Sequence, residues 1–168
     1  MNDEGTTSES HSATRAPRES STAAIVRLPH RARRPLNAAD WRLLVGVAVA
    51  QLVTAAALRA LPLSTLRRRA ARWRPIVQAV VRGSDERVIW ATHAAGRRLG
   101  RVSTCLVRAL VAELVIEDRD GLVLTIGVTR TASGAVGAHA WLTRGDRVLI
   151  GSTSDGYVPL VEWGHTSA

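Results

Sequence analysis

The sequence has little that could hold a chain together by covalent or metal chemistry. Cysteine occurs once among 168 residues, at Cys105. One thiol cannot form an intramolecular disulfide or build a cysteine-based zinc site, and a free thiol suits a reducing compartment. The N-terminus, MNDEGTTSES, lacks the basic start and apolar run of a secretory signal. We therefore expect a cytoplasmic protein without a metal or other cofactor.

Two residue types are missing altogether, and each absence shapes the surface or the core. There is no phenylalanine, so the core must be aliphatic, with five tryptophans as its large members. There is no lysine, so all 23 basic residues are arginine, and the formal net charge is +9. Arginine pairs bidentately with carboxylates and phosphates. The excess indicates an acidic peptide, an anionic membrane surface or nucleic acid as partner, although a nucleotide bias in the source genome explains it equally well.

The length allows one domain, which the composition divides into three parts. Residues 1–36 are polar, without a hydrophobic period, and predict a disordered tail. Residues 37–82 predict a helical region packed on or preceding the core, with Asn37 as N-cap and Asp40 in the first turn. Residues 83–168 contain the expected catalytic core.

The helical region combines an apolar helix with a basic one. Residues 43–61 are almost wholly apolar, but Gln51 and Thr54 interrupt them. A membrane span needs about 20 predominantly apolar residues, so we expect a packed or partner-facing helix instead. Residues 41–84 carry eight arginines and no acid. Such a pair of helices could bind a partner protein or lie along an anionic membrane surface.

Beyond residue 84 the hydrophobic period changes from helical to that of strands. The spacing predicts helices over 85–99 and 105–116, and strands over 122–129, 138–143 and 147–150. Helices followed by strands indicate an α+β fold. We expect a helix carrying Cys105 to pack on a small antiparallel sheet carrying His139.

Cys105 is the first candidate for chemistry. A lone cysteine is most often a small buried hydrophobic residue. Here Thr104 is a good N-cap and places Cys105 in the first helical turn. Unpaired backbone N–H groups and the positive end of the helix dipole stabilise a thiolate there, and they can hold an oxyanion.

His139 is the second candidate, because a cysteine nucleophile needs a base. It lies on a predicted strand between two alanines that leave room for substrate. An imidazole in that place can take the thiol proton and later protonate the leaving amine. Among the other histidines, His93 on a predicted helix remains the alternative base.

These two residues stand in motifs similar to those of the leader peptidases of lasso-peptide biosynthesis, members of the transglutaminase-like superfamily. The motifs are CLVRAL at 105–110, LTIGV at 124–128, AHAWL at 138–142 and YVPL at 157–160. The resemblance covers residues 38–163 and is strongest over 104–160. It implies a transglutaminase-like or papain-like cysteine peptidase core. Cys105 is the implied nucleophile and His139 the implied base, and the leader of a ribosomal lasso precursor peptide is the group removed.

The resemblance also implies partners. Some members are fused to an N-terminal leader-recognition domain, and the 36 residues before the first predicted helix are too few and too polar to fold as one. The chain is therefore similar to the split form, which acts with a separate small recognition protein. An ATP-dependent lasso cyclase is expected to close the ring after cleavage.

The family's third residue is an aspartate on the strand after the histidine, and this chain departs from that pattern. His139 should face Ile150 or Gly151, neither of which is an acid. Asp146 is expected at a turn, far along the strand. Asp155 follows closely and could orient the imidazole; otherwise a Cys–His dyad or another orienting group operates. The acid orients the base and does not accept its proton, so activity can survive its loss.

Two other classes remain open. A non-catalytic scaffold of a peptide-modification complex would explain the missing acid, but not the intact Cys105 and His139. A basic membrane-surface or nucleic-acid-binding protein would explain the arginines alone. Because the chain lacks the aromatic platform of a single-strand binder, nucleic acid is not the expected partner.

Overall fold

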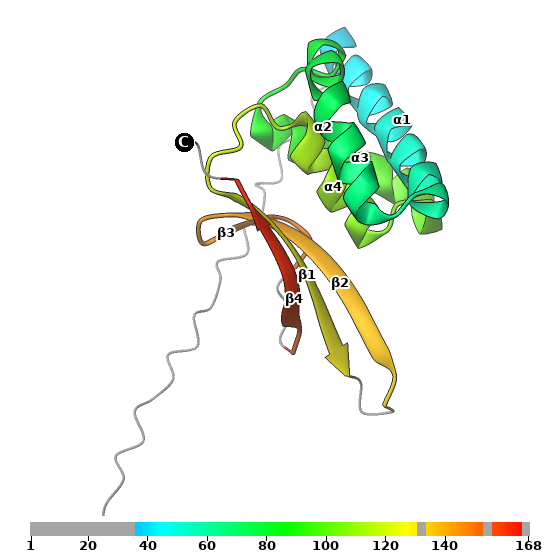
Figure 1. The fold of residues 1–168 in the computed structure, drawn as a ribbon. Coiled ribbons are helices and arrows are strands. Elements are labelled where there is room, and N and C mark those ends of the chain that lie inside the picture. Colours follow the sequence, from blue (N-terminus) through cyan, green and yellow to red (C-terminus); the bar gives the residue numbers. More distant parts are fainter. Residues whose placement is uncertain (1–35, 131–133, 153–155, 166–168) are drawn as a thin grey trace, which may run out of the picture.

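The protein consists of a layer of helices beside a four-stranded antiparallel sheet, so the predicted α+β class is confirmed (Figure 1). The structure is a computed structural model that describes residues 36–130, 134–152 and 156–165. The predicted tail therefore lies outside the described residues, apart from Leu36. The helices are α1 (Ala38–Ala60), α2 (Leu63–Val80), α3 (Asp85–Leu99), the 3-10 turn η1 (Gly100–Val102) and α4 (Cys105–Val115). The strands are β1 (Leu122–Arg130), β2 (Val136–Arg144), β3 (Arg147–Ile150) and β4 (Val158–Gly164).

Local signals set the helix ends. Asn37 and Asp40 form the two halves of a capping box at the start of α1. Gly100 ends α3 in a left-handed backbone conformation, with φ of +54°. The start of α1 and the end of α3 lie where the sequence predicts them, because each is decided by residues only a few positions apart.

The sheet has the strand order β3-β2-β1-β4, with β1 and β2 paired along their whole length. The sequence predicted three strands, and β4 is the addition. Pro159 concealed it, because proline cannot donate a ladder hydrogen bond and is confined to edge strands or bulges. In the structure β4 is an edge strand, and Pro159 lies opposite Gly127 where the register shifts.

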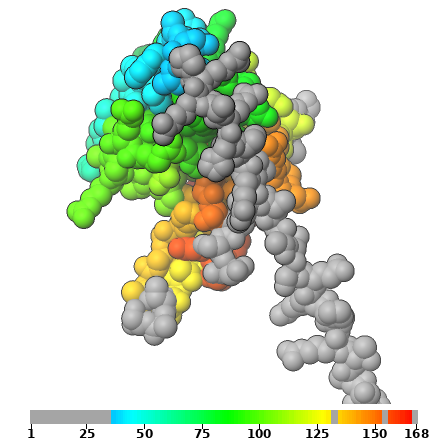
Figure 2. Space-filling view, turned by 180° about the vertical axis from the view of Figure 1, so that it is seen from behind, coloured from blue at the N-terminus to red at the C-terminus, as the bar shows by residue number. Residues whose placement is uncertain are grey.

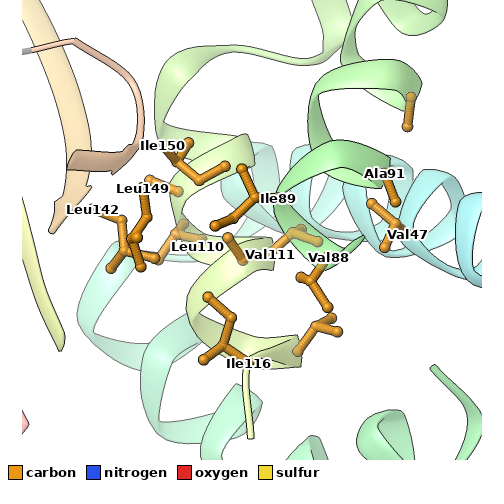
Figure 3. Packing of buried hydrophobic residues seen from close by; sticks show 14 of the residues in the cluster. Val47, Val88, Ile89, Ala91, Leu110, Val111, Ile116, Leu142, Leu149 and Ile150 are labelled. Atoms are coloured by element: carbon orange, nitrogen blue, oxygen red, sulfur yellow. The ribbon is translucent and has the colours of Figure 1, made fainter. Parts of the chain in front are cut away.

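The hydrophobic core lies between the helices and one face of the sheet, with α4 at its centre. Leu110 and Val111 of α4 meet Leu142 and Ile150 of the strands in this cluster (Figure 3). α1 adds Leu43, Leu44 and Val47 to the same cluster. The helices before residue 83 thus share one core with the strands.

The outer face of α1 is apolar as well as the inner one. Trp41, Val45, Val49 and Val53 are at least half exposed, at a spacing that places them on one face. By length and composition alone α1 could cross a membrane, although one such helix is weak evidence. The far ends of β1 and β2 extend beyond the helices and form a separate projection (Figures 1 and 2).

Candidate active site

Cys105 is the first residue of α4, as the sequence predicted. The Thr104 side chain caps the helix, and its hydroxyl accepts a hydrogen bond from the Val107 N–H at 3.3 Å. The thiol is free, half-buried and packed against the hydrophobic core.

The backbone around Cys105 offers hydrogen-bond donors. The Arg108 N–H donates to the Thr104 carbonyl, and the Val107 N–H is used by the cap. The N–H groups of Cys105 and Leu106 have no hydrogen-bond partner among the described residues. Two free donors beside a thiol at a helix N-terminus are the elements of an oxyanion hole.

A buried glutamine of α1 fixes the start of α4. Gln51 is fully buried, and its amide donates to the Thr92 carbonyl of α3 at 3.0 Å. Its carbonyl oxygen accepts from the Ser103 hydroxyl at 2.6 Å, and Ser103 is itself buried just before the cap of α4. Gln51, the polar residue that interrupts the apolar run, therefore fixes the position of the segment just before Cys105.

His139 lies on β2 opposite Gly127 of β1. Its ring centroid is 6.1 Å from that of Trp141 in a stacked arrangement and 5.3 Å from that of Tyr157. The backbone N–H of Ser152 donates weakly to His139 Nε2 at 3.4 Å. An aromatic wall and a backbone donor therefore set the orientation of the imidazole.

Burial lowers the pKa of His139 below the ordinary value, and the positive charge of Arg108 lowers it further, against a smaller rise from Ser152. The imidazole is consequently neutral at neutral pH, which is the form that can accept a proton. Arg108 also lowers the pKa of His93 on α3, after burial and together with Arg97. Arg108 is one turn after Cys105, so its charge links the cysteine helix to both histidines.

Arg108 was not among the residues singled out from the sequence. Its side chain crosses α3 at Gly96, where an added Cβ would lie 3.0 Å from Arg108 Cδ. Its Nε atom is buried without a hydrogen-bond partner in the described part of the chain. The signal was present in the CLVRAL motif, but placing Arg108 beside two histidines requires the packing of three elements.

Cys105 and His139 lie on neighbouring elements, since α4 packs chiefly on β2. No hydrogen bond joins the thiol to the imidazole among the described residues. Ala140 and Leu142 point into the core, so the alternation of the strand places His139 on its other face, with Trp141 and Tyr157. The described structure therefore does not bring the thiol and the imidazole together, because Cys105 packs against the core on the face of β2 opposite His139. Proton transfer between them requires His139 to move relative to α4.

Two glycines make room for the aromatic wall beside His139. An added Cβ on Gly127 would lie 2.6 Å from the Trp141 ring. Gly151 has φ of +89°, and a Cβ there would lie 2.9 Å from both the Ala140 carbonyl oxygen and Trp141 Cβ. The glycine of the LTIGV motif is thus required by close packing.

The acid expected to orient His139 is not placed. Ile150 pairs with Leu142, and a register shift follows at Thr143, so the expected facing of His139 by Ile150 or Gly151 is wrong. The Ser152 N–H contacts the imidazole instead, but as a donor to Nε2 it does not replace an acid, which would accept a hydrogen bond from the ring. Asp155, the predicted orienting acid, lies outside the described residues. In the described part of the chain no group of three or more His, Cys, Asp or Glu side chains could hold a metal ion.

Comparison with known families identifies the superfamily of the chain. The sequence profile of the transglutaminase-like superfamily matches residues 42–162, from α1 to β4. No curated protein and no solved structure gives a significant match. The match covers most of the chain, so the chain belongs to the transglutaminase-like superfamily, and the observed helices and antiparallel sheet are consistent with the core of that family.

Proposed function

We propose that this protein is a cysteine peptidase that removes the leader from a ribosomal lasso precursor peptide. The observation that carries the proposal is Cys105 at the start of α4, which packs on the strand of His139. Two backbone N–H groups beside Cys105 have no partner in the described part of the chain. Superfamily membership supports hydrolysis at a cysteine. The motifs of the sequence support the narrower choice of substrate.

The proposed chemistry begins when His139 and the thiol of Cys105 come into contact. Neutral His139 takes the proton of Cys105 Sγ, and the sulfur attacks the scissile carbonyl carbon. The N–H groups of Cys105 and Leu106 hold the oxyanion of the tetrahedral intermediate. His139 returns the proton to the leaving amine as the C–N bond breaks, leaving a thioester. A water activated by the same imidazole then releases the leader and regenerates the thiol.

We propose Asp155 as the group that orients His139, with a Cys–His dyad or another orienting group as the alternative. Asp155 follows Ser152 by three residues, and Ser152 already contacts the imidazole. An orienting acid fixes the tautomer of the base. Asp155→Asn should therefore slow cleavage strongly, while Asp146→Asn, in the β2–β3 turn, should leave the rate unchanged. Equal rates in both variants would favour the dyad.

The proposed partner is a separate small leader-recognition protein, and the outer face of α1 is the surface offered for it. Trp41, Val45, Val49 and Val53 form an exposed apolar stripe on that face. A patch of this kind on a folded protein usually marks an interaction site. Holding the leader on a docked partner would make cleavage effectively intramolecular, before an ATP-dependent cyclase closes the ring.

The test is leader release from the precursor, followed by mass spectrometry with and without the recognition protein. Cys105→Ala and His139→Ala should each reduce release to background, and the double variant should be little worse than either, because the two residues act as one unit. His93→Ala is the matched control and should remain active. Full activity of folded Cys105→Ala would exclude the peptidase, whereas equal rates with and without the partner would exclude only the split system.

A further inference from the structure

An open cavity lies toward the other end of α4, away from Cys105. It has a volume of about 430 Å³ and is lined by residues of α1, α2, α4, the segment after α4 and the end of β4. Glu113 of α4 lines it, eight residues after Cys105, so the two are separated by about 12 Å along the helix axis at 1.5 Å per residue. A volume in this range suits a small ligand or a side chain of a partner.

Positive charge dominates the lining. Arg67, Arg68, Arg74 and Arg119 line the cavity, and Glu113 is the only carboxylate among the described residues that line it. This leaves an excess of three positive charges before His165 is counted. Burial lowers the pKa of Arg67 and of Arg74, and the nearby charge of Arg119 adds to both shifts. The charges of the cavity are therefore incompletely neutralised by the protein itself.

Glu113 contacts three side chains through one of its carboxylate oxygens. Its Oε1 atom accepts from Arg67 at 2.7 Å and from Arg119 at 3.0 Å, and it lies 2.6 Å from His165 Nε2. Only 7% of its side chain is exposed. This single carboxylate holds Arg67 and Arg119 in place, but its one negative charge does not neutralise the positive charges around it.

Several donors remain unused. Arg67 Nη1, Arg74 Nε and Arg119 Nε are buried and have no hydrogen-bond partner within the described residues. Arg67 is fixed in position, since its guanidinium lies 4.4 Å from the centre of the Trp163 ring. Buried donors without partners cost free energy, so the protein's own acceptors in the described residues do not fully satisfy these guanidinium groups.

Most of the other lining residues are apolar. Leu66, Leu110, Leu114 and Trp163 contribute side chains beside the arginines. A free inorganic anion would satisfy the arginines but leave these walls uncovered. A carboxylate attached to an apolar peptide segment satisfies both, with the charge-assisted geometry that arginine favours.

We propose that this cavity is a binding site for an acidic side chain of a peptide, an aspartate or glutamate flanked by apolar residues. The site is separate from Cys105 and His139 and does not depend on the peptidase activity. It gives a defined place to the acidic partner that the arginine excess indicates.

The experiment follows the indole N–H resonance of Trp163 by NMR in the full chain, assigned with Trp163→Phe. The probes are acetyl-Leu-Glu-Leu-amide, acetyl-Leu-Gln-Leu-amide and sodium phosphate. We expect a saturable shift with the glutamate peptide and at least tenfold weaker binding of the glutamine peptide. Equal shifts with both peptides, a shift with phosphate alone, or no shift with any probe would each overturn the proposal.

Variants locate the site. Arg67→Gln should weaken binding of the glutamate peptide by about tenfold or more, since one charge-assisted contact is lost. Because Arg67 also holds Glu113, Arg68→Gln serves as a second variant that lines the cavity without touching Glu113, and it should weaken binding several-fold. Arg72→Gln, on the exposed side of α2 and outside the cavity, is the matched control. A loss of binding in Arg72→Gln equal to that in Arg68→Gln would show diffuse attraction, and the site would be rejected.

Discussion

The two ends of α4 are built in opposite ways. At the N-terminal end, two backbone N–H groups have no partner among the described residues, and Cys105 is partly exposed. At the C-terminal end, Arg74 donates to the Ile116 and Glu117 carbonyls at 2.7 and 2.9 Å, and Gln78 adds a bond to the Ile116 carbonyl at 3.0 Å. One end keeps its polar groups available for chemistry, while the other uses them for stability.

A glutamine from another helix contacts each end. Gln51 of α1 holds Ser103 before the first turn, and Gln78 of α2 holds the carbonyls after the last turn. Gln51 is fully buried, whereas Gln78 is partly exposed. The helices before residue 83 therefore position α4 at both of its ends: α1 holds the start and α2 holds the end.

The largest effect on stability is expected at the C-terminal end. Glu113→Gln removes the charge that joins Arg67 and Arg119 and leaves both cations uncompensated. Breaking a buried ion pair costs about 3–5 kcal/mol, so we expect the free energy of unfolding in urea to fall by roughly that amount. Glu117→Gln, at an exposed position just beyond the helix, should change it by less than about 0.5 kcal/mol.

The same variant tests the comparison itself. Since Glu113 is far from the thiol along the helix, the rate at which iodoacetamide alkylates Cys105 in the folded protein should be unchanged in Glu113→Gln. A clear change in that rate would show that the two ends are coupled, and the separation drawn here would be wrong.

Replacing either glutamine should lower the free energy of unfolding by less than Glu113→Gln does, and only one of the two replacements should also slow cleavage. Gln51→Leu leaves the Thr92 carbonyl and the Ser103 hydroxyl buried without their partner, which costs about 1–3 kcal/mol. It also loosens the segment before Cys105, so peptide cleavage should slow by about tenfold through misplacement of the nucleophile.

Gln78→Leu is the matched control for this prediction. It breaks the hydrogen bonds to the carbonyls at the other end of α4, in a partly exposed position. We expect a loss of unfolding free energy of about 1 kcal/mol and no change in the cleavage rate per folded molecule. If both variants slowed cleavage equally, Gln51 would have no special role in positioning Cys105.

The features that the sequence predicts are local ones, set by residues close together in the chain. The caps at Asn37 and Thr104 and the helix end at Gly100 were predictable, because each is decided by a few neighbouring residues. The helix carrying Cys105 and the strand carrying His139 were predictable from periodicity for the same reason.

The features that were not predictable depend on residues far apart in the chain. Gln51 reads as an interruption of an apolar run until Ser103, 52 positions later, is seen beside it. Glu113, Arg67 and His165 form one cluster from three separate segments. β4 was missed because Pro159 argues against a strand unless the edge position is known.

The smallest effect is a change in the pKa of two histidines near the N-terminal end of α4, which the charge of Arg108 lowers. Burial is the larger cause of the lowered pKa of His139, and Arg108 is the second. Arg108→Gln removes only the second cause, so the pKa of His139 should rise toward the ordinary value of about 6.5 without reaching it. The pKa of His93 should rise in the same variant, because Arg108 acts on it as well.

The sign of the linked effect follows from the direction of the shift. A histidine with a lowered folded-state pKa contributes stability above its unfolded pKa, and this stability is lost as the pH falls through the folded value. In Arg108→Gln the acid-induced loss should therefore be smaller, while the acid limb of cleavage should move to higher pH, because the base is protonated earlier. Arg97→Gln is the matched control: Arg97 acts on His93, so this variant should raise the pKa of His93 and leave that of His139 unchanged. Titration of the ring resonances by NMR measures both values. If Arg97→Gln moved His139 as far as Arg108→Gln does, general surface charge would be acting, and Arg108 would not be the specific link between the cysteine helix and its base.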